Sequence, residues 1–243
     1  MRKLAKAIAA IMLVTMVVFA AGCTPEDDPN NGGGNNSGGI GTCNGHEYVD
    51  LGLPSGTLWA TCNVGATTPE GYGDNFAWGE TETKTTYNWS TYNYCNGSSD
   101  QLFKYCNNSN FGYNGFADTL TTLLSEDDAA AANWGSGWCI PTSDQWRELE
   151  DNTNSVWITQ DSVNGRLFTA SNGNSLFLPA AGNRWDISIG GVGASGFYWS
   201  NLLAPDGPSC SWCYYFYSEH HSIEYTRRYI GQSVRAVRSA RQN

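Results

Sequence analysis

The clearest alternation of side chains along this chain lies near its C-terminus, in residues 212–218. Successive side chains of a β-strand point to opposite faces, so the even-numbered aromatic residues here share one face. If that face points into a core, then Cys213, Tyr215 and Tyr217 point away from it. The Ser-Glu-His-His run that follows is too polar for burial on both faces. We therefore expect the odd-numbered face to be exposed to a partner.

Weaker patterns predict the other elements. Short hydrophobic stretches predict strands at residues 48–49, 58–60, 175–178, 196–200 and 232–238. Residues 125–134 place acidic side chains ahead of four alanines, which favours a helix. Thr142 and Gln145 form a capping box that begins a second helix, and Trp146 and Leu149 share one face of it. The expected class is α+β, loop-rich, with a mostly antiparallel sheet and two short helices.

The N-terminus has the pattern of an export signal. Arg2, Lys3 and Lys6 precede an apolar run over residues 7–21, and small residues lead to Cys23. An apolar run of about 15 residues is shorter than the roughly 20 needed to span a bilayer. The pattern resembles a bacterial lipoprotein signal peptide, covering residues 1–22, and implies lipid on Cys23.

Residues 23–44 are rich in Gly, Asn and Pro, and we expect them to form a flexible tether. Glu26, Asp27 and Asp28 resemble the acidic export signal of surface lipoproteins in the Bacteroidetes. That resemblance implies an outer-membrane, lipid-anchored and surface-exposed domain. A solvated acidic linker is the simpler alternative.

Residues 210–230 hold five of the 13 tyrosines and two of the three histidines. Tyr offers a large contact area with few rotatable bonds, while Ser and His offer adaptable hydrogen bonds. We expect a ligand-binding surface here, and the alternative is an ordinary sheet of paired aromatic residues. The candidate ligand-binding residues are Cys210, Cys213, Tyr215, Tyr217, His220, His221, Ser222, Tyr225, Arg227, Arg228 and Tyr229.

Seven motifs carry a family resemblance. They occupy residues 48–65, 76–80, 133–135, 140–142, 172–182, 196–200 and 231–238, and include Phe76-Ala-Trp-Gly-Glu80 and Gly196-Phe-Tyr-Trp-Ser200. Together they resemble the Fibrobacter succinogenes major paralogous domain. The resemblance implies that residues 45–243 form one C-type lectin-like domain of the formylglycine-generating-enzyme subtype. Most members of that family are exported lipoproteins without an assigned activity. Cys139 departs from the family, in which we expect an Arg.

Few residues suggest catalysis or a bound cofactor. The family resemblance makes a copper-dependent oxidase the enzymatic alternative, with Cys210 and Cys213 as the paired thiols, but the Arg-Gly-Gly-Ser motif of those enzymes is missing. His220 and His221 are adjacent, so on a strand they point to opposite faces and cannot easily share a metal ion. A net charge of -10 argues against nucleic acid as a partner. We expect a non-enzymatic protein without a metal or cofactor.

The cysteines constrain the chain further. Eight cysteines less the lipidated Cys23 leave an odd number, so at least one thiol stays free or pairs with another molecule. Cys95 and Cys106 flank a polar loop and are the first choice for a disulfide. Cys62 with Cys139, and Cys210 with Cys213, are further options.

These observations favour a lipid-anchored, cell-surface ligand-binding protein whose partner is a protein or glycan on another surface. The membrane contact is expected through the lipid alone. The alternative is a structural component of the cell envelope with a permanent subunit interface. The C-terminal segment also resembles targets of diversity-generating retroelements, in which template adenines are rewritten and AAC codons become any NNC codon. The candidate residues lie between residues 198–200 and 233–235, two motifs expected to stay fixed.

Overall fold

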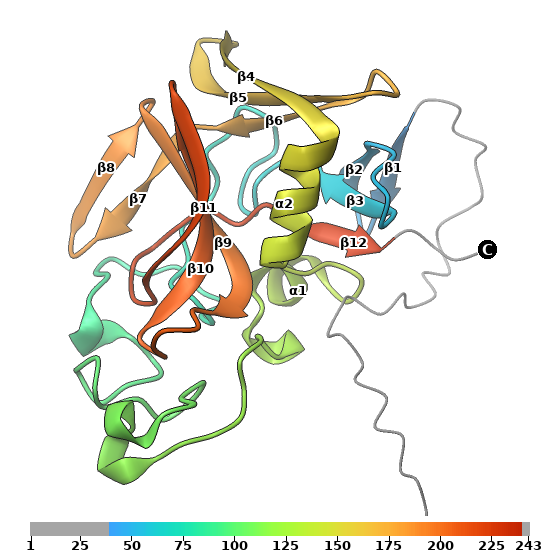
Figure 1. Cartoon of the computed structure of the whole chain (residues 1–243). Helices are drawn as coiled ribbons and strands as arrows, with labels where there is room; N and C mark the ends of the chain where they lie inside the picture. The colour runs from blue at the N-terminus through green and yellow to red at the C-terminus, as the bar shows by residue number, and fades with distance from the viewer. Residues whose placement is uncertain (1–38, 240–243) are drawn as a thin grey trace, which may run out of the picture.

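The computed structural model describes residues 39–239, and within them the chain is mostly β (Figure 1). The described residues form twelve strands, two α-helices and four short 3-10 helices. The strands form a four-stranded, a five-stranded and a three-stranded sheet. The expected loop-rich, mostly antiparallel arrangement with two short helices is confirmed. Cys23 and its neighbours lie outside the described residues.

The four-stranded sheet joins the two ends of the described chain. Its order is β1-β2-β3-β12, with β1 at Ile40–Cys43, β2 at His46–Asp50, β3 at Thr57–Ala60 and β12 at Val237–Ser239. Asn44 and Gly45 connect β1 to β2 with φ of 50° and 79°, as a type I′ hairpin turn requires. The strands of this sheet therefore begin before residue 45, the position at which the domain was expected to start.

The helix α2, Ser143–Asn152, begins where the capping box predicts. Thr142 accepts a hydrogen bond from the Gln145 backbone N–H, and the Gln145 side chain accepts one from the Thr142 N–H. Trp146 and Leu149 lie on the buried face of the helix. In Figure 1 this helix stands between the five-stranded and four-stranded sheets.

The other helix is shorter than residues 125–134. A 3-10 turn, Ser125–Asp127, comes first, and α1 covers only Ala129–Trp134. Asp128 separates the two with extended backbone angles, and its side chain accepts hydrogen bonds from the N–H groups of Ala130 and Ala131. An N-cap side chain of this kind begins a new helix rather than continuing the preceding turn.

The five-stranded sheet has the order β11-β10-β9-β7-β8. These strands are β7 at Ala181–Trp185, β8 at Ser188–Val192, β9 at Ser195–Leu203, β10 at Cys210–Tyr217 and β11 at His220–Arg227. The pairing of β7 with β9 is parallel and the others are antiparallel. The three-stranded sheet contains β4 at Thr153–Gln160, β5 at Val163–Ala170 and β6 at Ser175–Pro179.

The expected strand at residues 232–238 is mostly not a strand. Only Val237 and Arg238 of it belong to β12, and Gln232 and Ser233 form isolated bridges to Phe76 and Tyr198. The segment is nevertheless fully buried, because it passes between the sheets. The alternating pattern of this segment therefore correctly indicates burial. It does not indicate a continuous run of strand pairing.

Two large hydrophobic clusters form the core. One gathers around Trp78 and Trp199, and the other around Trp59 and Trp146. Trp59, Trp78 and Trp199 are 0% exposed and Trp134 is 7% exposed. These four tryptophans come from the motifs that carry the family resemblance, and all four are buried.

Candidate ligand-binding surface

Strands β10 and β11 pair without interruption, from Cys210 opposite Arg227 to Tyr217 opposite His220. Their side chains therefore divide into two sides. We call the side that faces α2 the helix side, and it carries Tyr214 and Phe216. We call the other the open side, and it carries Tyr215 and Tyr217.

The open side presents a cluster of aromatic rings. Phe197 of β9 stacks on Tyr215 with ring centroids 4.6 Å apart and 26° between the planes. Tyr217 lies 5.8 Å from Tyr215 and 5.5 Å from the His220 ring. Tyr217 is 37% exposed and Phe197 and Tyr215 are half-buried. Tyr215 and Tyr217 thus point outward, as the alternation predicts.

A row of polar side chains from β11 borders these rings. His220 Nε2 lies 3.1 Å from Ser222 Oγ, and Ser222 donates to Glu224 at 2.6 Å. Within residues 39–239 the hydroxyls of Tyr215 and Tyr217 have no hydrogen-bond partner. We define the aromatic patch by its six members, which are Phe197, Tyr215, Tyr217, His220, Ser222 and Glu224.

Cys213 lies on the same side as Tyr215 but is only 2% exposed, so it cannot contact a ligand in this structure. The open side is covered at this end, where Cys213 and Trp199 pack into the cluster of Phe76 and Trp78. Burial raises the pKa of the Cys213 thiol to about 12. Cys213 therefore lies on the side that the alternation predicts. That side is exposed only along the outer half of β10.

The helix side carries a separate exposed group. Trp212 meets Tyr225 edge to face at 5.4 Å, and the Arg147 guanidinium lies 6.0 Å from the Trp212 ring. The Tyr225 hydroxyl donates to Asp206 at 3.2 Å. Cys210 lies across from Arg227 at the end of this side.

His221 is also on the helix side, where it contacts Glu150 of α2. The sequence-predicted set is thus split by the sheet. Tyr215, Tyr217, His220 and Ser222 lie together on the open side. Cys210, His221, Tyr225 and Arg227 lie on the other side.

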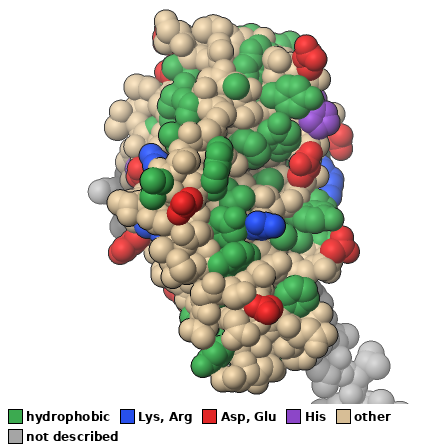
Figure 2. Space-filling view, turned by 90° about the vertical axis from the view of Figure 1, so that its left-hand side faces the viewer, with side chains coloured by type: hydrophobic (Ala, Val, Ile, Leu, Met, Phe, Trp, Pro, Cys, Tyr) green, Lys and Arg blue, Asp and Glu red, His purple; other side chains and the backbone are tan. Residues whose placement is uncertain are grey.

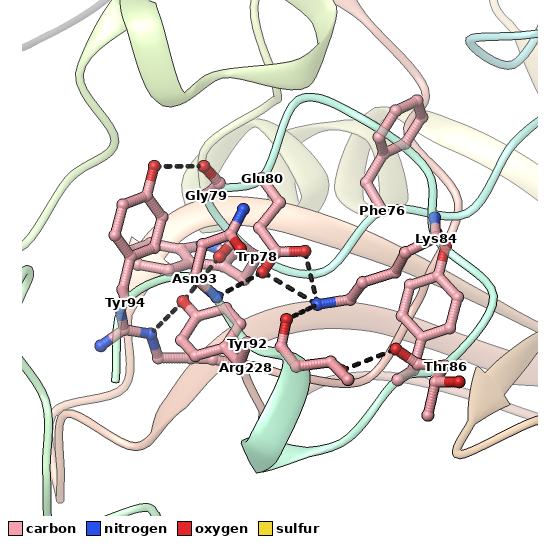
Figure 3. Close-up of polar contacts among 12 residues, drawn as sticks. Phe76, Trp78, Gly79, Glu80, Lys84, Thr86, Tyr92, Asn93, Tyr94 and Arg228 are labelled. Atoms are coloured by element: carbon pink, nitrogen blue, oxygen red, sulfur yellow. Dashed lines mark hydrogen bonds and ion pairs between the residues drawn. The ribbon is translucent and has the colours of Figure 1, made fainter. Parts of the chain in front are cut away.

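Arg228 is not a surface residue, and its predicted role in ligand binding is wrong for this structure. Its exposed fraction is 0%. The guanidinium donates to the carbonyls of Lys104, Tyr105 and Pro208 at 2.7–3.1 Å and to the Tyr92 hydroxyl at 2.8 Å. In Figure 3 a dashed line joins the Arg228 guanidinium to the Tyr92 hydroxyl. The residue ties the end of β11 to the loops around residues 92 and 105.

Tyr229 is half-buried and packs edge to face against Trp89 at 5.0 Å. Next to this contact lies a buried polar network (Figure 3). Lys84 pairs with Glu80 at 2.6 Å and donates to the Thr91 carbonyl, while Glu80 accepts from the Asn93 N–H at 2.7 Å. Each polar group has a protein partner, so the network fixes the loops rather than awaiting a ligand.

The structure does not contain the disulfide predicted between Cys95 and Cys106. Both are buried free thiols, and they donate to the carbonyls of Trp89 and Asn108. Cys62, Cys210 and Cys213 are also free. The options that paired Cys62 with Cys139, and Cys210 with Cys213, are therefore not realised either.

The separation of Cys210 from Cys213 has a geometric cause, because the two residues are three positions apart on one strand and point to opposite sides. They do not converge on one copper ion.

The β7–β8 hairpin carries a second apolar surface. Trp185, Ile187, Ile189 and Val192 are 47%, 76%, 48% and 43% exposed. Figure 2 views the molecule from the side at the left of Figure 1, where this hairpin lies. Hydrophobic side chains gather in a broad band there, with charged side chains scattered among them.

Sequence reasoning missed several members of these surfaces. Phe197 shares its side of β9 with the buried Trp199, so alternation alone predicts a buried residue. Glu224 carries no signal of its own, and only the pairing of β10 with β11 reveals its place. Trp212 lies on the side that the alternation assigns to the core, but it is only half-buried.

No helix within residues 39–239 is long and apolar enough to cross a membrane. In the same residues no group of three or more His, Cys, Asp or Glu side chains is arranged to hold a metal ion. A scan against protein-family models found no match, and searches among curated proteins and solved structures found no similar protein.

Proposed function

We propose that this chain is a lipid-anchored cell-surface protein that binds a protein or glycan through the aromatic patch. The observation that carries the proposal is the stacked pair Phe197–Tyr215 beside Tyr217 and His220. Exposed aromatic rings with unpartnered hydroxyls combine a large apolar contact area with free hydrogen-bonding groups. Neither property stabilises the free protein, so a partner is the physical reason to keep them.

The proposal extends to the specific fold of the domain. We place the domain in the C-type lectin-like fold, on the basis of its resemblance to the major paralogous family. The supporting observations are the sheet that joins β1 to β12, the helix α2 packed against the central strands, and the long loop-rich segment between β3 and α1. The lipid on Cys23 and the position outside the outer membrane rest on the N-terminal sequence alone.

The structure indicates which residues of the C-terminal segment could be exchanged if the segment is diversified. The two framework motifs, residues 198–200 and 233–235, are 0% exposed. Between them, Tyr215, Tyr217, His220 and Ser222 are at least partly exposed on one side, so exchanging them would alter the surface without disturbing the core. Cys213 and Arg228 are buried and would be poor positions for free exchange.

An array experiment tests the proposed function. Residues 24–243, carrying a fluorescent label, are applied to glycan and surface-protein arrays. The proposal predicts one class of ligand that is lost with Tyr217→Ala and retained with Tyr225→Ala, since Tyr225 is as exposed but lies on the helix side. Binding that is unaffected by Tyr217→Ala contradicts the assignment of the aromatic patch.

A permanent subunit interface is the second candidate function, and the exposed β7–β8 hairpin favours it. Trp185 and Ile187 would bury apolar area in a stable oligomer. Sedimentation of the same protein over a range of concentrations separates the two. A stable oligomer that becomes monomeric with Ile187→Asp supports the structural role, and a monomer at all concentrations excludes it.

A further inference from the structure

A pocket of about 440 Å³ opens on the far strands of the four-stranded sheet, away from the aromatic patch. Its size lies within the range of small-molecule sites. The residues that line it are Gly45, His46, Glu47, Thr61, Cys62, Ala66, Thr67 and Trp134. Two of them, Cys62 and His46, have the chemistry of a nucleophile and a base.

The sheet register brings these two side chains together. Tyr48 pairs with Ala60, and the Thr61 N–H donates to the Glu47 carbonyl at 3.0 Å, which continues the antiparallel pairing by one residue. Extending this register two residues past the end of β3 places Cys62 opposite His46. Side chains of a directly opposed antiparallel pair lie on the same face with Cβ atoms about 5 Å apart. Both side chains line the same pocket, as this register requires.

His46 is held in place by stacking. Its ring lies 4.0 Å from that of Trp134, with only 12° between the planes. Burial lowers the pKa of His46 from its ordinary value. The imidazole is therefore neutral at pH 7 and can accept a proton.

A buried cation lies behind Cys62. Arg235 is 0% exposed, and it donates to the carbonyls of Ala60 and Thr61 at 3.0 Å and 2.5 Å and to Asn63 Oδ1 at 2.9 Å. These acceptors flank Cys62 along the chain. The Arg235 Nη2 atom is buried and has no hydrogen-bond partner.

Arg235 has no carboxylate partner among residues 39–239, and its hydrogen-bond partners are neutral groups. Burial lowers the pKa of Arg235, and negative charge on Tyr198 or Cys62 acts in the opposite direction. Arg235 is thus a buried cation whose hydrogen-bond acceptors lie on both sides of Cys62 along the chain.

We propose that Cys62 is a reactive thiol that forms a mixed disulfide with a small disulfide bound in this pocket, with His46 as the base. The thiol proton passes to His46, and the Cys62 sulfur attacks one sulfur of the small disulfide. A new S–S bond forms to Cys62, and the S–S bond of the small molecule breaks. The other half leaves as a thiolate and takes up a proton. The small disulfide is the oxidant, so atoms and electrons balance.

Thiol mapping of the full chain tests the proposal. The protein is incubated with cystine at pH 7, and modification of each cysteine is followed by peptide mass spectrometry. Cys62 is expected to react about tenfold faster than Cys210, the other partly exposed free thiol among residues 39–239, and faster than Cys62 in the urea-unfolded chain. His46→Gln is expected to slow Cys62 by about tenfold or more and to leave Cys210 unchanged.

The unchanged rate of Cys210 reports that the His46→Gln variant is folded. If the His46→Gln variant unfolds, the reaction rates of Cys62 in native and in urea-unfolded wild-type protein still test the proposal. The proposal is overturned if native Cys62 reacts no faster than unfolded Cys62. It is also overturned if Cys62 in a folded His46→Gln variant keeps its full rate.

Discussion

The ring of Trp146 on α2 stacks on the ring of Tyr214 on β10, with centroids 4.9 Å apart and 9° between the planes. This contact assigns one side of the aromatic strand to the core and leaves Tyr215 and Tyr217, its neighbours along the chain, on the other side. Strand β10, eight residues long, thereby contributes to both the core and the surface.

Replacement of Trp146 by Ala is expected to lower the free energy of unfolding by about 3–5 kcal/mol, because it leaves a cavity against Tyr214 and Trp59. Tyr217→Ala is the matched control and is expected to change it by less than about 1 kcal/mol. Urea unfolding monitored by fluorescence measures both. Equal losses in the two variants would mean that the aromatic patch is part of the core.

Arg227 and Arg228 are adjacent in sequence, and we expect them to contribute very differently to the free energy of unfolding. Arg228→Ala leaves three buried carbonyls and the Tyr92 hydroxyl without their donor, and should destabilise the fold by about 3 kcal/mol or more. Arg227→Ala removes an exposed side chain and should change stability by about 0.5 kcal/mol at most. Thermal and urea unfolding compare the pair. Similar stabilities for the two variants would contradict the buried position of Arg228.

Asp128 should make stability depend on pH. Burial raises its pKa from 3.8 to about 6, although three backbone N–H groups donate to the carboxylate. Between these values the folded chain holds a proton that the unfolded chain has lost, so the free energy of unfolding falls as pH rises from about 4 to about 6. The Asp128 contribution to this fall is up to about 3 kcal/mol.

Asp128→Asn serves as the control for this effect, because Asn keeps the N-cap of α1 and does not titrate. Other carboxyl groups titrate in the same range, so the informative quantity is the wild-type stability minus that of the variant. This difference should decrease across pH 4–6. Two parallel pH profiles would mean that Asp128 has no raised pKa.

The proposed lipid anchor predicts the behaviour of Cys23→Ala. Without the acylated cysteine the chain loses its only strong membrane attachment, and it should leave the membrane fraction while keeping the melting temperature of the mature protein. Cell fractionation with protease accessibility of whole cells measures both location and surface exposure. A variant that stays with the outer membrane would contradict the anchor.

Local signals predicted the features that depend on neighbouring residues. The capping box of Thr142 and Gln145 needs only a four-residue window, and it located the start of α2. The alternation in β10 correctly separated Tyr214 from Tyr215.

Features set by distant parts of the chain were not predictable in this way. Strand β11 has a polar sequence on both sides because it lies at a sheet edge, and no hydrophobic pattern marks it. Cys213 is buried because residues near Trp78 and Leu123 cover one end of the open side. Arg227 and Arg228 are adjacent in sequence, but β11 ends at Arg227. Arg227 is exposed, whereas Arg228 turns into the interior.

The most direct test of the ligand-binding account measures binding of the ligand identified on the arrays to three forms of the protein. Wild type, a Tyr215→Ala, Tyr217→Ala double variant and a Tyr225→Ala variant are compared by calorimetry, after equal folding is checked by circular dichroism. The account predicts that the double variant loses at least about 2 kcal/mol of binding free energy and that Tyr225→Ala loses less than about 0.5 kcal/mol. Undiminished binding by the folded double variant would contradict it.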